Sequence, residues 1–169
     1  MTSPGGAVAA AERGVRARHV ALAVYGALVA TTLLVAADDG LDAGELFEAL
    51  VTTGVVLWLA HAFAAAVGRA VADGRHLELP AVLDCMRDEL GLLVGFLVPL
   101  PAIALGIFDL LGDARAADVA IGVLLGLLLV VGTVLGRLAG MGFLSAVLMG
   151  LAYPALGAAV ILLEVAVKH

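Results

Sequence analysis

Five long apolar stretches, separated by short charged segments, organise the chain. They cover residues 20–37, 46–67, 90–108, 119–138 and 142–165. A helix that crosses the ~30 Å hydrocarbon core of a bilayer needs about 20 mostly apolar residues, and these stretches match that requirement. Open sheet edges are not tolerated in lipid, and the stretches lack the alternating pattern of barrel strands. The pattern therefore predicts an all-α transmembrane helical bundle with five spans.

The positions of the basic residues predict how the spans are oriented. Seven arginines lie in the N-terminal tail or in the segments after the second and fourth spans, whereas only Arg115 and Lys168 lie on the opposite side. Such an excess marks the cytoplasmic side, so the N-terminus is expected inside and the C-terminus outside. Residues 1–19 then form a flexible basic cytoplasmic tail. Residues 20–169 form a single multi-pass domain of the plasma membrane.

The first apolar stretch has a second interpretation. Three arginines precede it, and Val35, Ala36 and Ala37 before Asp38 resemble the cleavage site of a secretory signal peptide. Its apolar run of 18 residues is longer than the ~7–15 residues typical of such a segment. A retained span is therefore the favoured interpretation, and cleavage would leave four spans.

Composition supports the membrane interpretation and excludes other classes of protein. Apolar residues make up 63% of the chain and charged residues 14%, against roughly 25% charged residues in soluble domains. So few charges cannot cover the surface of a soluble domain, whereas a bilayer removes that requirement. The nine basic residues are scattered, which argues against nucleic-acid binding. The expected partners are the lipid bilayer and, in addition, a second copy of the chain or another membrane protein.

Polar residues at membrane depth are the candidates for a functional site. His61 lies in the second span, about 22 Å from its start at 1.5 Å per residue. Ionisable residues are rare at this depth, and a histidine titrates near neutrality, so His61 could relay protons. Otherwise it hydrogen-bonds a neighbouring helix; in both cases it should face the bundle interior. The same span adds Trp58 on the face of His61, Thr53 further out, and Glu48 near its outer end.

Prolines predict breaks in two spans. Pro99 and Pro101 fall near the middle of the third span, and Pro154 lies within the fifth. Each proline removes a helical hydrogen-bond donor and clashes with the preceding turn, so a kink or interruption is expected. An interrupted span can expose carbonyl groups to an ion or substrate, although kinked packing is the commoner meaning. Residues 80–89 mix apolar and charged positions and predict a short amphipathic helix before the third span.

Glycines at GxxxG spacing predict close contacts between helices. The pairs are Gly91/Gly95, Gly122/Gly126, Gly132/Gly136 and Gly136/Gly140. Such pairs let two helix backbones approach closely. We expect them to pack the bundle, and only secondarily to form a dimer interface.

The motifs of catalysis and cofactor binding are missing from the sequence. The chain has no HExxH, no GxSxG, no P-loop and no dinucleotide fingerprint. No second histidine lies at metal-ligand spacing from His61, and a haem held between two spans would need one. We therefore expect no catalytic, cofactor-binding or metal-binding residues and no enzymatic activity.

Three segments carry a resemblance to known proteins. The basic tail leads into RHVALAVYGALV, the second span continues as LWLAHAFAAAVGRAVADGR, and a short final span follows later. The run Trp-Leu-Ala-His around Trp58 and His61 is the most specific part. In this layout the chain resembles uncharacterised small multi-pass integral membrane proteins of high-GC actinobacteria, which implies no assigned activity. The expected function is that of a non-enzymatic structural, regulatory or complex-forming bundle. The alternative is a small proton- or ion-linked channel or transporter that uses His61 and the kinked third span.

Overall fold

Helices account for nearly all of the described chain. The computed structural model describes the backbone of residues 4–37 and 41–168. Side chains are described for residues 14, 15, 17–37, 41–155, 157–159 and 162. The helices in this part are α1 (Pro4–Ala36), α2 (Ala43–Ala72), α3 (Leu79–Asp88), α4 (Leu90–Leu97), α5 (Leu100–Ile107), α6 (Asp113–Leu138) and α7 (Phe143–Lys168). No strand occurs among the described residues, so the all-α class is confirmed.

Four helical segments are long and apolar enough to cross a membrane. They are Ala17–Ala36 in α1, Ala43–Ala72, Leu90–Ile107 across α4 and α5, and Asp113–Leu138. A shorter apolar stretch, Phe143–Ala159, lies in α7. The composition and length of these helices therefore support a membrane-embedded helical bundle with four candidate spans.

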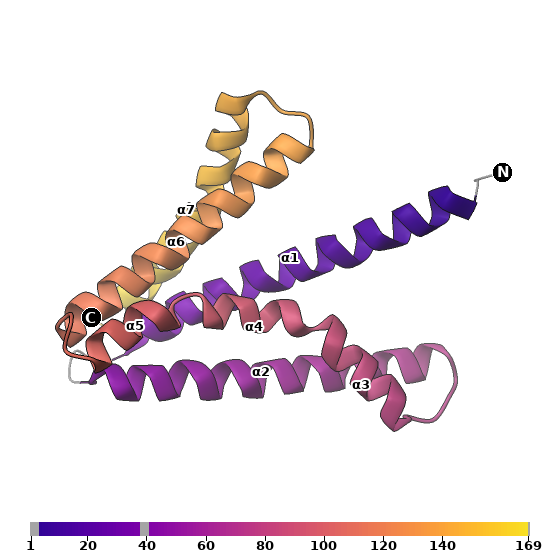
Figure 1. Ribbon diagram of the computed structural model, residues 1–169, viewed down its shortest axis with the longest axis horizontal. Coiled ribbons are helices and arrows are strands. Elements are labelled where there is room, and N and C mark those ends of the chain that lie inside the picture. The colour runs from indigo at the N-terminus through magenta and orange to yellow at the C-terminus, as the bar shows by residue number, and fades with distance from the viewer. Residues whose placement is uncertain (1–3, 38–40, 169) are drawn as a thin grey trace.

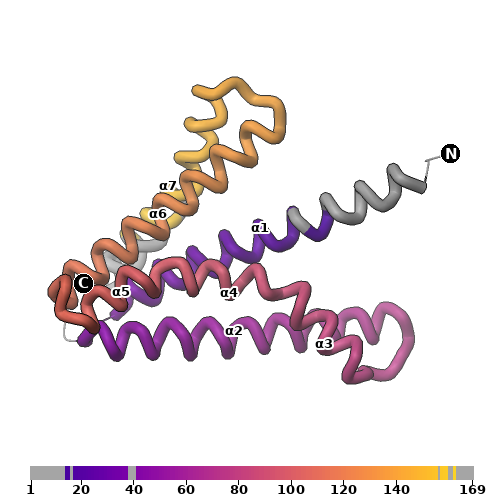
Figure 2. Tube along the Cα trace, in the orientation of Figure 1, coloured from indigo at the N-terminus to yellow at the C-terminus, as the bar shows by residue number. Residues whose placement is uncertain are grey.

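Consecutive spans run in opposite directions and form a wedge. Figure 2 traces the chain from α1 into α2, back along α4 and α5, and then through the hairpin of α6 and α7. The helices converge where α1 ends and α2 and α6 begin (Figure 1). At the opposite end, α1, the α2–α3 connection and the α6–α7 hairpin diverge from one another. The core between them consists mainly of alanine and leucine side chains.

Local sequence explains where several helices begin and turn. At the start of α2, the Asp42 carboxylate accepts a hydrogen bond from the Glu45 amide at 2.8 Å, and Glu45 accepts one from the Asp42 amide at 3.1 Å. This reciprocal pair satisfies two backbone donors that no helical carbonyl reaches. Gly140 closes the α6–α7 hairpin with φ +82°, a conformation that glycine adopts without a steric penalty. Gly140 therefore provides the turn between α6 and α7.

Glycine allows α1 and α4 to pack backbone to backbone. A Cβ placed on Gly91 would lie 2.8 Å from the Cα of His19, and one on Gly95 would lie 2.5 Å from the carbonyl carbon of Gly26. Both distances are too short for a real side chain. The Gly91/Gly95 pair therefore packs the bundle, as the sequence predicted.

Some glycines of the other GxxxG pairs pack against a neighbouring helix, and others are exposed. A Cβ on Gly136 would lie 2.9 Å from the Cα of Ala146 on α7, so this glycine packs the α6–α7 hairpin. A Cβ on Gly122 or Gly126 would meet nothing within 4 Å. The outer face of α6 therefore carries a glycine pair that no described part of the chain covers.

The third span is interrupted, whereas the fifth apolar helix is not. α4 ends at Leu97 and α5 begins at Leu100, with Val98 and Pro99 between them. Pro99 has no N–H to donate to the carbonyl of the preceding turn, so the regular ladder stops there. By contrast, α7 continues through Pro154, and the break expected at that position is not present. Packing of α7 along α6 holds the helix together, as neighbouring helices often do for prolines in membrane proteins.

The backbone of the N-terminal segment is helical from residue 4 onward. α1 begins at Pro4, so the backbone of residues 4–19 continues the first span as helix. The segment is rich in alanine, which has the highest helix propensity, and proline fits the first turn of a helix. Residues 80–89 were predicted as an amphipathic helix and form most of α3.

Candidate functional site

An ion pair between α1 and the α3–α4 junction is the main buried polar feature of the described chain. The Arg18 guanidinium donates from Nη2 to Oε1 of Glu89. Only 3% of the Glu89 side chain is exposed, against 42% of the Arg18 side chain. The second carboxylate oxygen, Oε2, is buried and has no hydrogen-bond partner among the described side chains. A buried acceptor without a donor lowers the stability of the fold, so a further hydrogen-bond donor at Glu89 would be favourable.

A second ion pair lies beside the first and connects α3 to α2. Arg69 Nη2 donates to Oδ2 of Asp88 at 2.7 Å, and the two side chains are 42% and 39% exposed. Asp88 and Glu89 are adjacent in the chain, so one short segment binds α1 through Glu89 and α2 through Asp88. We call the four residues Arg18, Arg69, Asp88 and Glu89 the charge clamp.

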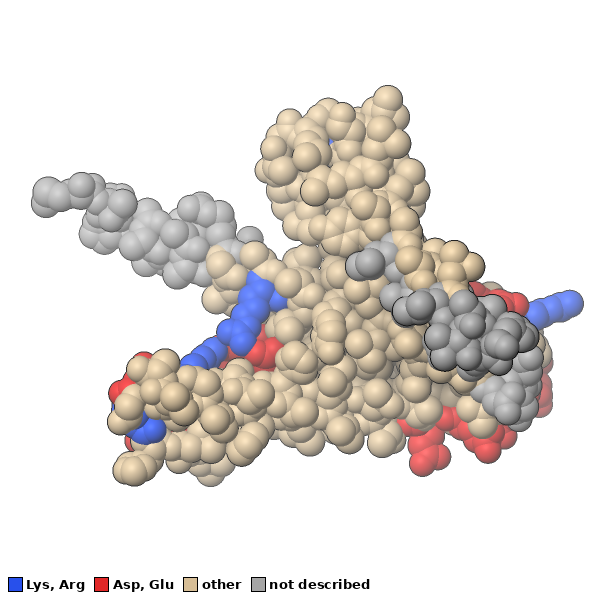
Figure 3. Space-filling model, turned by 180° about the vertical axis from the view of Figure 1, so that it is seen from behind, with Lys and Arg blue, Asp and Glu red and all other residues tan. Residues whose placement is uncertain are grey.

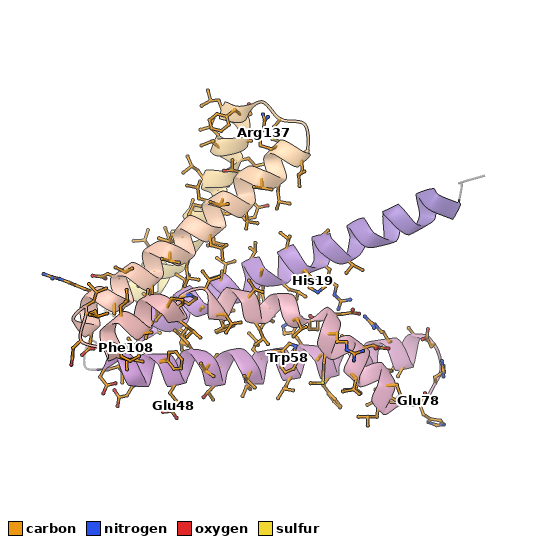
Figure 4. The ribbon with its side chains drawn as sticks, in the orientation of Figure 1. His19, Glu48, Trp58, Glu78, Phe108 and Arg137 are labelled. Carbon is orange, nitrogen blue, oxygen red and sulfur yellow. The ribbon has the colours of Figure 1, made fainter. Side chains whose placement is uncertain are left out.

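The charge clamp borders a cavity at the divergent end of the bundle. The cavity has a volume of ≈ 370 Å³ and is lined by Gly14, Val15, Arg18, His19, Arg69 and Asp88. Figure 3 shows basic and acidic side chains next to each other in the angle between α1 and the α2–α3 end. His19 points from α1 toward this region (Figure 4), and its Nδ1 is 2.9 Å from the Val15 carbonyl, which accepts the bond. The cavity therefore combines guanidinium, carboxylate and imidazole groups.

The histidine predicted as the central site residue contacts a neighbouring span. His61 is partly buried, and its ring lies against Tyr25 of α1 with centroids 5.4 Å apart and planes tilted by 56°. Among the described residues, no hydrogen bond or ion pair of the His61 side chain is present. His61 thus acts in this structure as an aromatic contact between α2 and α1.

The other predicted site residues do not gather around His61. The Trp58 indole donates to the Met86 carbonyl of α3 at 3.0 Å, so it fixes α3 against α2. Thr53 is partly buried and Glu48 is exposed, and Figure 4 shows Glu48 and Trp58 at different levels of α2. The structure therefore distributes these residues along one helix and does not join them through hydrogen bonds or ion pairs in the described part.

The residues of the charge clamp were missed as a site because the sequence shows them as separate charges. Arg18 precedes the first predicted span, Arg69 follows the apolar part of the second, and Asp88 and Glu89 precede the third. A usable signal was present, since all four flank the predicted spans at the ends that an up-and-down arrangement brings together. Which of the many flanking charges meet depends on the docking of α1 against α4, and the sequence pattern does not specify that docking.

The convergent end of the bundle also carries acidic residues. Asp113 at the start of α6 accepts a hydrogen bond from the Ala43 amide of α2 at 3.3 Å. It also lines, with Asp118, a cavity of ≈ 300 Å³ whose other walls are apolar. Among the described residues, neither end groups three or more side chains that could hold a metal ion.

Known proteins provide no template for either end of the bundle. Comparisons of the chain with protein families, with curated proteins and with solved structures find no match.

Proposed function

We propose that the chain is a non-enzymatic plasma-membrane protein whose helical bundle has a structural, regulatory or complex-forming role. The supporting observation is that its buried polar groups bond to the bundle itself. Among described side chains, Thr31 and Glu89 are the buried polar ones. Thr31 Oγ1 donates to the Ala27 carbonyl at 2.8 Å, and Glu89 pairs with Arg18. The Thr31 bond lies within α1 and the Glu89 pair holds two helices together, so both groups serve the bundle and not a path for a transported species.

The proposed bundle has five spans, with the N-terminus inside and the C-terminus outside. α7 has 26 residues, about 39 Å at 1.5 Å per residue, which is enough to cross a bilayer. It runs back along α6, so a fifth crossing brings the chain to the convergent end. The arginine-rich divergent end then faces the cytoplasm.

Cysteine labelling in intact cells tests this topology. Cys85 is first replaced by Ser, and single cysteines are then placed at position 42 and at position 75. We expect an impermeant maleimide added outside to label position 42 and to leave position 75 unlabelled until the membrane is opened. Labelling of position 75 from outside would refute the proposed orientation.

A second candidate function is proton- or ion-linked transport. Two observations favour it: the His61 ring contacts Tyr25 between two spans, and the third span is interrupted at Val98 and Pro99. A lone ionisable group at membrane depth is nevertheless a poor proton path across ~30 Å of hydrocarbon. We therefore rank this function below the first.

Flux measurements separate the two candidates. The purified protein is reconstituted into liposomes that contain a pH-sensitive dye, and a pH gradient is applied. A non-transporting bundle should give the same proton leak as empty liposomes, and His61→Phe should leave that leak unchanged. A proton flux in the wild type that His61→Phe abolishes, with the helical content retained, would favour transport and contradict the first proposal.

A further inference from the structure

We propose that the charge clamp and its cavity bind the headgroup of an aminophospholipid, with phosphate at the arginines and ammonium at Asp88. The inference goes beyond the proposed function but rests on its placement of this end of the bundle at a membrane surface. Arg18 lies at the start of the first span, Arg69 near the end of the second, and Glu89 directly before the third. All the groups involved therefore lie at one membrane interface, at the level of lipid headgroups.

The arginines retain donors for a phosphate. Arg18 and Arg69 each use Nη2 for the ion pair of the clamp. A guanidinium has five N–H donors in a fork, so Nη1 and Nε of each arginine remain available. Arginine binds phosphate oxygens with paired hydrogen bonds, and both side chains line the cavity.

The Asp88 carboxylate favours a ligand that also carries N–H donors. Asp88 lines the cavity and uses Oδ2 in its hydrogen bond to Arg69, which leaves Oδ1 as an acceptor. Glu89, the next residue, is not among the residues that line the cavity, so Asp88 is the carboxylate that a ligand there would meet. A primary ammonium has three donors and could bond to Oδ1 of Asp88. The available acceptor of Asp88 thus favours a cationic donor in addition to the phosphate.

The charge balance of the clamp argues against a simple anion. Two arginines and two carboxylates give no net charge, so a free phosphate would compete with the carboxylates for the guanidiniums. A zwitterionic headgroup with a phosphate and a primary amine, such as phosphatidylethanolamine, matches both signs at once. Phosphatidylcholine has the same charges but no N–H on its quaternary nitrogen, and phosphatidylglycerol has the phosphate without an amine.

Titration with three short-chain lipids tests the proposal. The full chain in detergent is mixed with dioctanoyl phosphatidylethanolamine, phosphatidylcholine or phosphatidylglycerol, and bound lipid is measured by native mass spectrometry. We expect phosphatidylethanolamine to bind roughly 10-fold more tightly than the other two, because charged hydrogen bonds to the amine are lost in them. Equal binding of the three lipids, or tighter binding of phosphatidylglycerol, would overturn the proposal.

Variants and soluble ligands complete the test. Asp88→Asn should reduce the preference for phosphatidylethanolamine to about 2-fold or less, since a neutral amide attracts an ammonium weakly. Asp84→Asn is the matched control, because Asp84 pairs with Arg87 on the exposed side of α3 and should leave the preference unchanged. A preference that survives Asp88→Asn would refute the ammonium site. Inorganic phosphate or phosphoethanolamine that competes as strongly as the lipid would refute the assignment to a membrane lipid.

Discussion

One methyl group on Gly95 should force two helices apart. A Cβ at this position would lie 2.5 Å from the carbonyl carbon of Gly26 and 2.6 Å from the carbonyl oxygen of Ala23, both backbone atoms of α1. Ordinary contact begins at 3.4 Å, so the backbones must separate by nearly an ångström. Overpacking of this kind costs about 1–3 kcal/mol, whereas alanine in a helix gains about 0.5–1 kcal/mol over glycine. Gly95→Ala should therefore lower the free energy of unfolding by about 1–2 kcal/mol.

Gly122 on α6 provides the matched control for this substitution. A Cβ there meets nothing within 4 Å, so Gly122→Ala should raise the free energy of unfolding by about 0.5–1 kcal/mol through helix propensity alone. Unfolding in mixed micelles with increasing SDS can be followed by the fluorescence of Trp58, the single tryptophan of the chain. The reasoning would be refuted if both substitutions shifted stability in the same direction, because backbone contact at Gly95 would then not limit packing.

Two further predictions concern polar contacts between helices of the bundle. Arg18→Gln leaves the buried Glu89 carboxylate without its cation and should lower the free energy of unfolding by about 1–3 kcal/mol. Adding Glu89→Gln to Arg18→Gln should recover part of that loss. If the loss in the double variant equalled the sum of the losses in the two single variants, the two residues would not interact. Trp58→Phe removes the hydrogen bond to α3, which contributes about 1 kcal/mol. Since α3 should then open more often, its fully buried Cys85 thiol should react with a maleimide about 5-fold faster. An unchanged rate would mean that the indole does not hold α3 in place.

The membrane helices were predictable from the sequence because their signals are local. Apolar length and proline act within a few residues, and they predicted the four candidate spans, the interruption of the third span and the amphipathic α3. At Pro154, by contrast, α7 continues as one helix, so the proline does not interrupt it there.

The arrangement of the polar residues was less predictable because it depends on packing between helices. Trp58 and His61 are three residues apart, which places them near the same face of α2. Three residues still leave an angular offset of about 60° around a helix, which lets Trp58 reach α3 while His61 reaches Tyr25 of α1. The pairing of Arg18 with Glu89 spans 71 positions of the chain and follows from the glycine-based approach of α1 to α4. A hydropathy pattern contains no information about such pairing.

The divergence of the helices has a consequence for the shape of the surrounding membrane. In the proposed orientation the convergent end occupies the outer leaflet, and the divergent end occupies the cytoplasmic leaflet (Figure 1). The protein then displaces more lateral area in the inner leaflet than in the outer one. Such an asymmetric inclusion favours a curved bilayer over a flat one, and several copies gathered in one region would add their effects. The divergence of the described helices would in this way influence the membrane well beyond the lipids in direct contact with the protein.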